Sequence, residues 1–281
     1  MTVAIVTDSG SDLTPALLAE HKIRQVPLTV SFAESNFLSP DELSPEDFWK
    51  RISSPGAPFP HTSTPSAGQF RQAYEELFAQ GAEAIVSVHL SETLSSTIKS
   101  AEMAKAMLPG KQIEIVDSRS ASMAVGALAL HGARMAAAGA RAAAIAEALR
   151  QRRQRVTLFV ALETLEYLRK GGRISSAEAT IGGLLAIKPI ITVEEGIVVT
   201  ADKPRTRSKA HERVIELLTD RAAEEVHVLY SPPVDEGAFR EALVAHMPKP
   251  APKLVTSQVL GPVIGSHIGP GAYGAVLVRA E

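Results

Sequence analysis

Hydroxyl, imidazole and guanidinium groups are the functional side chains that this sequence gathers into short polar segments. Serine and threonine hydroxyls, imidazole and arginine can all donate hydrogen bonds to an anion. No cysteine and no cluster of carboxylates accompanies them. This set of side chains favours binding a carboxylate or phosphate over breaking a covalent bond. The segments are Thr62–Ser66, Ser91–Thr97, Lys170–Ser175 and the glycine-rich Gly261–Ala272.

The glycine-rich segment holds a single histidine, His267, among glycines and prolines. Glycine lets a backbone approach a ligand closely, so we expect Gly261–Ala272 to be a loop. In that loop His267 either makes a structural hydrogen bond or contacts an anion. Gly269–Gly274 also fits the pattern GxGxxG. A dinucleotide-binding fingerprint must open a helix, whereas this pattern precedes the strand predicted over Ala275–Val278, so we exclude a dinucleotide site.

Two hydroxyl-rich segments precede predicted helices. We expect Thr62 and Ser63 to be a helix N-cap pair, because serine and threonine are common at that position. Ser95 and Ser96 stand in the same relation to the next helix. A helix start also has free N–H groups and the positive end of a dipole, which suit a carboxylate or phosphate. Both interpretations stay open, and the two helix starts together could hold both oxygens of one carboxylate.

Arginines occur in two further polar segments. Arg173 follows two glycines, so we expect it on an exposed loop near the end of a helix, where a positive charge is favourable. Arg205 and Arg207 lie in the polar turn Lys203–Arg207. Such a turn is either simply hydrated or a clamp for a phosphate.

Composition excludes several classes of protein. The 281 residues carry a formal net charge of −2, which gives no general attraction to nucleic acid or to an anionic membrane. The chain is 45% hydrophobic but only 5% aromatic, so its core and any pocket in it should be aliphatic. The absence of cysteine excludes disulfides and thiolate metal sites and fits a cytoplasmic location. No apolar run is long enough to predict a membrane span.

An alternation of strands and helices must position the polar segments. It predicts parallel βαβ units in a layered α/β lobe, with ligands at the carboxyl ends of the strands. The segments after Val6, before Ala67 and after His89 are expected at that edge. Predicted strands cover Val3–Val6, Arg24–Phe32, Ala84–His89 and Gln112–Val116, and predicted helices cover Leu13–His21, Pro45–Ile52, Ala67–Gln80, Ser96–Met107, Met123–Ala138 and Ala142–Gln154.

A second α/β lobe, with a mixed sheet, is predicted after the basic run Gln151–Arg155, which gives lobes of residues 1–155 and 156–281. An apolar stretch, Ile181–Ile191, leads into a hairpin predicted from Ile190–Val193 and Ile197–Thr200. The other predicted strands are Val156–Ala161, Glu225–Tyr230, Leu254–Val259 and Ala275–Val278, and the predicted helices are Leu162–Arg169, Lys209–Arg221 and Glu236–Met247.

Taken in order, the polar segments resemble the motifs of the DegV family, which includes the fatty-acid-binding subunits of bacterial fatty acid kinase. Each motif is weak alone, but the ordered set spans about residues 3–279. Thr64 and Ser96 depart from the pattern, because the family usually has Gln and Gly there. The matching pieces are Val6-Thr7-Asp8-Ser9 with Asp12, Thr62-Ser63 with Pro65, Ser91, Leu94, Ser95 and Thr97 with Ala101, Val116-Asp117-Ser118, Lys170–Ile174 and Gly265–Ala272.

The resemblance implies a two-lobed α/β fold that buries a long-chain fatty acid, such as palmitate, between the lobes. It implies that Thr62, Ser95 and His267 bind the carboxylate, with Ser63 and Ser96 as further candidates. The chain would then be a carrier and not an enzyme, without a metal or other cofactor.

The resemblance also implies a protein partner. In the family's kinase system a separate ATP-dependent subunit phosphorylates the bound carboxylate, and the product supplies phospholipid synthesis. Arg173 and Arg205 are expected at the surface that docks this kinase subunit or handles the phosphate.

Two other functions stay open at this point. One is an enzyme acting on a small carboxylated or phosphorylated metabolite, with Ser95 as nucleophile and His267 as base. The other is a regulatory or scaffold protein in which a bound lipid is structural. Exchange of the lipid with added fatty acid would separate the second from a carrier.

Overall fold

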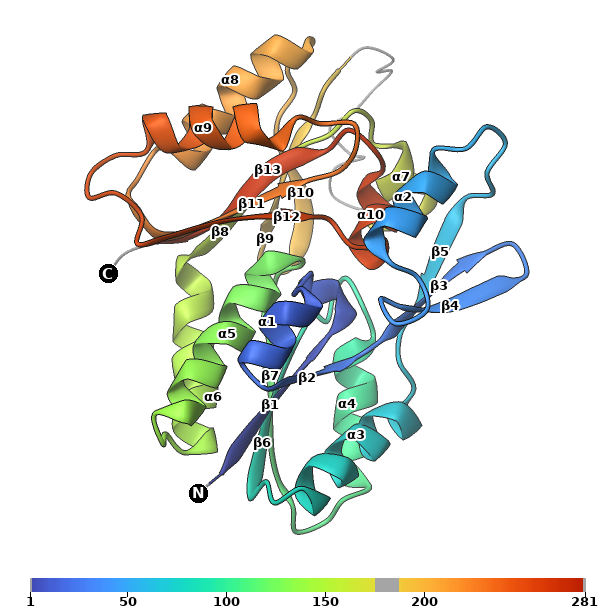
Figure 1. Cartoon of the computed structure of the whole chain (residues 1–281), viewed down its shortest axis with the longest axis vertical. Helices are drawn as coiled ribbons and strands as arrows, with labels where there is room; N and C mark the ends of the chain where they lie inside the picture. Colours follow the sequence, from blue (N-terminus) through green and yellow to red (C-terminus); the bar gives the residue numbers. More distant parts are fainter. Residues whose placement is uncertain (1, 175–186, 280–281) are drawn as a thin grey trace.

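The computed structural model describes residues 2–174 and 187–279. These residues form two α/β lobes that pack against each other (Figure 1). Ser175 and the part of the apolar stretch at 181–186 lie outside the described residues. Strands before residue 118 form a four-stranded and a three-stranded sheet, and those after residue 155 form a six-stranded sheet. The predicted α/β class, with one parallel and one mixed sheet, is confirmed. The lobe boundary at residue 155 stays a prediction.

The four-stranded sheet is parallel throughout, in the order β2-β1-β6-β7. Its strands are β1 (Val3–Asp8), β2 (Ile23–Val26), β6 (Ala84–His89) and β7 (Gln112–Asp117). The helices of this lobe are α1 (Pro15–Glu20), α2 (Pro45–Ile52), α3 (Ala67–Ala79), α4 (Thr97–Ala106), α5 (Met123–Ala137) and α6 (Ala142–Arg152).

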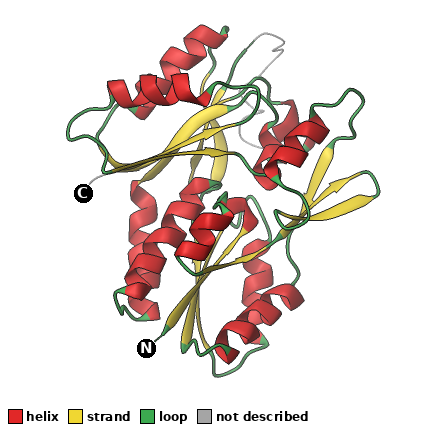
Figure 2. Ribbon diagram, viewed as in Figure 1, coloured by secondary structure: helices red, strands yellow, loops and turns green. Residues whose placement is uncertain are grey.

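Helices cover both faces of this sheet, as Figure 2 shows. Successive residues of β1 point to opposite faces: Ile5 packs in the cluster with α5 and α6, and Val6 packs in the cluster with α3 and α4. A sheet buried on both faces needs strands that are apolar along their length, which is why β1 and β6 are so apolar. The polar segments after β1 and β6 therefore lie at the carboxyl edge of the sheet, as expected.

A three-stranded antiparallel sheet, in the order β4-β3-β5, projects to one side of this lobe (Figure 1). It consists of β3 (Leu28–Phe32), β4 (Ser35–Ser39) and β5 (Pro60–Ser63). The prediction of one strand over Arg24–Phe32 is wrong, because the strand breaks at Pro27. Proline has no N–H for a ladder, so β2 stays in the parallel sheet while β3 joins the other one.

The interpretation of Thr62 and Ser63 as a helix N-cap pair is also wrong. Both residues lie in β5, where they pair with β3. The cap of α3 is Ser66, which forms a capping box with Gln69. The Thr62 segment consequently reaches the site from the small antiparallel sheet and not from the edge of the parallel one.

The six-stranded sheet has the order β10-β9-β8-β13-β11-β12, with β11 and β12 as its only parallel pair in the described chain. Helices α8 and α9 cover its outer face, and its inner face meets the N-terminal lobe (Figure 1). The elements are β8 (Val156–Ala161), β9 (Ile190–Glu194), β10 (Ile197–Asp202), β11 (Ala223–Tyr230), β12 (Leu254–Val259), β13 (Tyr273–Arg279), α7 (Glu166–Lys170), α8 (Arg207–Leu218) and α9 (Glu236–His246).

The glycine-rich segment contains a helix, α10 (Pro262–Ile268), so the prediction of a loop over Gly261–Ala272 is wrong for its first half. Gly265 lies inside this helix. Glycine is required at this position because any larger side chain would collide with the aromatic rings of α2. Glycine at this position serves close packing and not backbone freedom. Gly269, with a φ of +73°, then follows the helix end.

Candidate functional site

A narrow cavity, here called the interlobe cavity, lies between the inner face of the six-stranded sheet and the N-terminal lobe. The cavity volume is about 100 Å³. Its apolar lining is aliphatic throughout and comes from both lobes. The lining residues are Leu28, Leu90, Leu94, Ala121, Leu158, Val160, Leu168, Ile191, Val193, Val198, Leu229, Val263, Ile264 and Ile268.

A small set of polar side chains lines the same cavity. Of the residues proposed from sequence, Ser96 and Arg205 are exposed and are absent from this lining. The functional roles of all these residues stay predictions, but most of the predicted site residues share one cavity although they come from distant segments. The polar lining consists of Thr62, Ser63, Thr64, Ser95, Ser122, Arg173 and His267.

His267 and Thr62 form the best-defined contact of the polar lining. His267 stands in the last turn of α10, and its Nε2 atom lies 2.9 Å from the Thr62 hydroxyl oxygen. No described residue offers a hydrogen-bond partner to the buried Nδ1 atom. Because an unpaired buried N–H is less tolerable than an unpaired lone pair, we assign the ring proton to Nε2. Thr62 then accepts from His267, and its own hydroxyl proton is free to point at an anion.

The imidazole of His267 is neutral at physiological pH. Burial lowers its pKa to about 4, and the positive charge of Arg173 and a contribution from His61 act in the same direction. A neutral ring acts as a directional hydrogen-bond donor and does not compensate a negative charge. The site therefore has to hold an anion chiefly through hydrogen bonds, with Arg173 as the nearby positive charge.

Gly171 packs against the ring of His267, and Arg173 lies close to the same ring. A Cβ atom at Gly171 would overlap His267 Nδ1, so only glycine allows the ring to lie against this turn. The Arg173 guanidinium donates from Nη1 to the Gly171 carbonyl (2.6 Å) and from Nε to the Leu94 carbonyl (3.1 Å). The expectation of an exposed Arg173 is wrong, because these two bonds draw its side chain partly into the protein, beside the segment that carries Ser95.

Ser95 approaches the cavity from the start of α4. Its hydroxyl lies 2.8 Å from that of Thr97 and accepts from the Thr97 N–H (3.3 Å). Ser95 therefore lies at a helix start on the cavity lining, and its part in ligand binding stays a prediction. Ser95 makes no hydrogen bond to His267, whose Nε2 contacts Thr62 instead. The geometry therefore does not support a nucleophile and base pair of Ser95 and His267.

Asp12 fixes the position of the helix that carries His267. Its buried carboxylate accepts from the Gly261 N–H (3.0 Å), just before α10, and from the Ser122 hydroxyl (2.5 Å). Burial raises the pKa of Asp12 to about 7, although these two hydrogen bonds oppose the rise. Nothing in the sequence around Asp12 indicates a partner 249 residues away, so its role could not be predicted from sequence.

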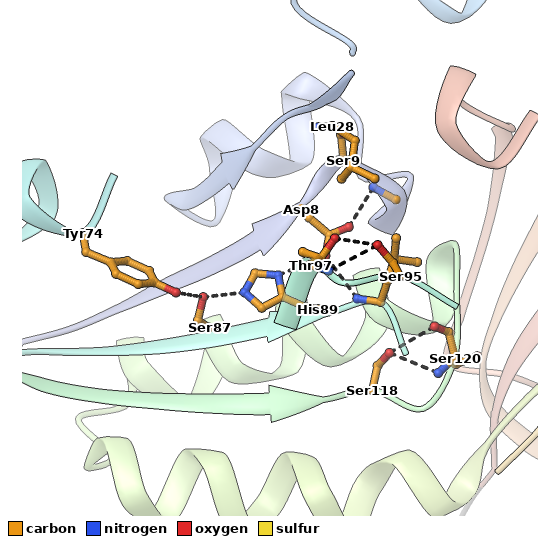
Figure 3. A network of polar contacts seen from close by, with 12 residues as sticks. Asp8, Ser9, Leu28, Tyr74, Ser87, His89, Ser95, Thr97, Ser118 and Ser120 are labelled. Carbon is orange, nitrogen blue, oxygen red and sulfur yellow. Dashed lines mark hydrogen bonds and ion pairs between the residues drawn. The ribbon is translucent and has the colours of Figure 1, made fainter. Parts of the chain in front are cut away.

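A second buried network lies at the end of β6, just before the segment Ser91–Thr97 (Figure 3). Asp8 Oδ2 lies 2.9 Å from His89 Nδ1, and His89 Nε2 lies 2.6 Å from the Ser87 hydroxyl. The order carboxylate, imidazole, hydroxyl is that of a hydrolase triad, but all three side chains are fully buried and Tyr74 donates to Ser87. Since no substrate reaches Ser87, we interpret this network as structural.

The sequence model of a family described as "Uncharacterised protein, DegV family" matches residues 2–280. This chain therefore belongs to the DegV family. A DegV domain-containing protein of Mycobacterium tuberculosis is 36% identical, over 98% of this chain and 96% of the relative. The protein DegV of Bacillus subtilis is 33% identical, over 98% of each chain.

Solved structures of the family share this fold. One, described as fatty acid binding of a DegV family protein from Thermus thermophilus, superposes with a TM-score of 0.91 at 33% identity and covers 100% of both chains. The crystal structure of Bacillus subtilis DegV, described as a fatty acid binding protein, has a TM-score of 0.86 at 31% identity, over 99% of this chain and 100% of that one. No helix among the described residues is long and apolar enough to cross a membrane.

Proposed function

We propose that this protein binds one long-chain fatty acid in the interlobe cavity, with its carboxylate held by the hydroxyls of Thr62 and Ser95, and with His267 completing the polar network through its hydrogen bond to Thr62. The observation that carries the proposal is one narrow cavity that combines an aliphatic lining with a few hydrogen-bond donors. That combination matches an alkyl chain with a single polar end. The two structural relatives described as fatty-acid-binding proteins support the same assignment.

The energetics favour a carrier for this ligand. Burying an alkyl chain contributes about 0.8 kcal/mol per methylene, or roughly 12 kcal/mol for about fifteen methylenes before association costs. The carboxylate must keep hydrogen-bond donors when it leaves water. The free hydroxyl proton of Thr62 and the Ser95 hydroxyl supply them, and Ser63 is a further donor on the cavity lining.

We further propose that a separate ATP-dependent kinase subunit receives the bound fatty acid and phosphorylates its carboxylate for lipid synthesis. The protein described here would then present a substrate and perform no chemistry itself. Arg173 lies close enough to His267 to influence its pKa, which suits it to the charge of a phosphate formed there. Arg205 is exposed and makes no hydrogen bond or ion pair to another described residue, so it is free to contact a partner.

The kinase part of this proposal is tested with Arg205→Ala. Because Arg205 does not line the cavity, the variant should bind palmitate as the wild type does. With the kinase subunit and ATP, we expect acyl-phosphate formation to fall about tenfold, the scale of one lost charged contact. Lys209→Ala, another exposed cation near the start of α8, is the matched control. An unchanged rate for Arg205→Ala would remove this residue from the kinase surface.

A further inference from the structure

Ser122 is a polar residue of the interlobe cavity that the sequence motifs do not include. It lines the cavity just before α5, and its backbone has a φ of +58° and a ψ of −147°. This conformation favours glycine, and other residues that adopt it concentrate at functional sites. Because glycine would fit this backbone with less strain, the presence of serine indicates a function for the hydroxyl group.

The segment that carries Ser122 adjoins the segment that carries Ser95. The Ser91 N–H donates to the Ser120 carbonyl (2.9 Å), and the Ser95 N–H donates to the Ser91 carbonyl (3.0 Å). Ser95 and Ser122 therefore reach the cavity from neighbouring stretches of backbone. Because both side chains line one cavity of about 100 Å³, an anion bound by Ser95 should also lie near Ser122.

Asp12 is the acceptor for the Ser122 hydroxyl. Its Oδ2 atom lies 2.5 Å from that hydroxyl oxygen, and its Oδ1 atom accepts from the Gly261 N–H (3.0 Å). Asp12 is only 8% exposed, and no described residue forms an ion pair with it. Burial consequently raises the pKa of Asp12 to about 7, so the protonated and ionised forms are both populated near neutral pH.

The charged and titratable groups around Asp12 do not compensate its charge. Asp8, at the end of β1, raises the pKa of Asp12 further and is itself paired with His89 at the end of β6. The titratable residue of α10 is His267, which is neutral, and the first two turns of α5 contain none. The cation on the cavity lining is Arg173, beside His267. A change of charge at Asp12 is therefore not cancelled by an adjacent cation.

The proton on Asp12 determines where the Ser122 hydroxyl can donate. An ionised carboxylate only accepts hydrogen bonds, so Ser122 donates to it and has no proton left for the cavity. A carboxyl group that has taken a proton from solvent can donate it to the Ser122 oxygen, while its other oxygen still accepts from Gly261. The Ser122 proton is then free to point into the cavity.

Protonation of Asp12 favours an anion in the cavity through two effects. It adds a hydrogen-bond donor to the site, and it removes a negative charge that would repel the ligand carboxylate. Both effects have the same sign, so the affinity for an anion should rise as pH falls through the range in which Asp12 titrates. By reciprocity, a bound anion should favour the protonated form of Asp12.

We propose that Ser122 is a further carboxylate-binding residue, and that Asp12 is a positioning residue whose protonation turns the Ser122 hydroxyl toward the fatty acid. This inference rests on the proposed function. It distinguishes Ser122 from Thr62 and Ser95, whose hydroxyls have neutral partners. Binding of the fatty acid should accordingly be accompanied by partial uptake of a proton near neutral pH.

Replacing Asp12 by asparagine tests this inference. The new amide is neutral at every pH, its N–H group can donate to Ser122, and its oxygen can accept from Gly261, so Asp12→Asn resembles the protonated form. The probe is cis-parinaric acid, a fluorescent fatty acid, and its affinity is measured by titration between about pH 8.5 and about pH 6. We expect wild type to bind about tenfold more tightly at the lower pH, the scale of one hydrogen bond to a charged group. Asp12→Asn should bind at this tighter affinity throughout, a gain that a misfolded protein cannot produce.

The matched control for the lost carboxylate is Asp220→Asn. Asp220 pairs with Arg279 and does not line the cavity, so this variant should keep the wild-type pH dependence. Any titration of the probe itself would appear equally in both asparagine variants.

Removal of the Ser122 hydroxyl should have the opposite effect to Asp12→Asn. Ser122→Gly introduces a residue that suits the backbone, so the fold should survive. At about pH 6 we expect it to bind the probe about tenfold more weakly than wild type. The matched control is Thr219→Val, which removes a hydroxyl–carbonyl bond at the end of α8, away from the cavity, and should bind as wild type does.

The outcomes separate this inference from the proposed function. A wild-type affinity that does not change with pH, or an Asp12→Asn variant that keeps the wild-type pH dependence, overturns the inference while fatty-acid binding stands. Wild-type affinity in Ser122→Gly also overturns it, because Ser122 would then not contact the ligand. A wild-type protein that binds no probe at any of these pH values overturns the proposed function itself.

Discussion

Replacing Thr62 and Ser95 together by alanine is expected to weaken fatty-acid binding at least about a hundredfold while the fold survives. Each hydroxyl that bonds to a charged group contributes about 1.5–3 kcal/mol, and tenfold in affinity corresponds to about 1.4 kcal/mol. Without both hydroxyls the carboxylate would keep Ser63, the ring of His267 and the charge of Arg173 nearby. Titration with a fluorescent fatty acid measures the affinity, and circular dichroism checks the fold.

The matched control for this pair is Ser208→Ala. Ser208 is exposed on α8 and bonds only to Glu212 among the described residues, so its loss should leave the affinity unchanged. Unchanged binding by the double variant would refute the assignment of the carboxylate site. Weakened binding by Ser208→Ala would show that the assay responds to general destabilisation.

The second large effect is expected at Glu225 on β11, where the two lobes are tied together by charge. Its side chain is 9% exposed and accepts from Arg134 of α5 (3.1 Å) and Arg152 of α6 (3.0 Å). Glu225→Ala leaves the buried Arg152 with Glu224 (2.8 Å) as its remaining partner, so the loss should lie below the about 3–5 kcal/mol that breaking an isolated buried pair costs. Urea unfolding should show this loss in the free energy of unfolding.

The Glu225 carboxylate should also make the free energy of unfolding depend on pH. Burial alone would raise its pKa, but the hydrogen bond with His227 and the charges of Arg134 and Arg152 outweigh burial and lower the pKa of Glu225 to about 2. Its stabilisation is therefore complete above the unfolded pKa of 4.5 and is lost as pH falls from there toward 2. Glu225→Gln should lack this part of the pH dependence, whereas Glu147→Ala, an exposed glutamate on α6, should keep it. Identical pH profiles for Glu225→Gln and wild type would contradict this account.

Regular hydrophobic patterns made most of the fold predictable. The apolar strands β1 and β6 and the amphipathic helices between them carry their periodicity in local sequence, so their type and order follow from it. The predictions are wrong where a contact between residues far apart in the sequence determines the local structure. Gly265 resembles a loop residue until the aromatic rings of α2 are seen packed on it. Pro27 interrupts the stretch predicted as one strand over Arg24–Phe32, and the two halves pair in different sheets.

The membership of the site was more predictable than its geometry. The ordered motifs identify Thr62, Ser95 and His267, and the structure places all three on one cavity. That the hydroxyl of Thr62 meets the ring of His267 could not be inferred, since 205 residues separate them. The contribution of Asp12 and the fit of Gly171 against the imidazole likewise depend on packing between lobes, which no local pattern encodes.

The most direct test of fatty-acid binding is native mass spectrometry of the purified protein, followed by extraction and analysis of any lipid. The account predicts one long-chain fatty acid per chain, which added palmitate or oleate replaces. A chain that carries no lipid and takes up neither added fatty acid would contradict it. A lipid that never exchanges would instead favour a structural role for the ligand over that of a carrier.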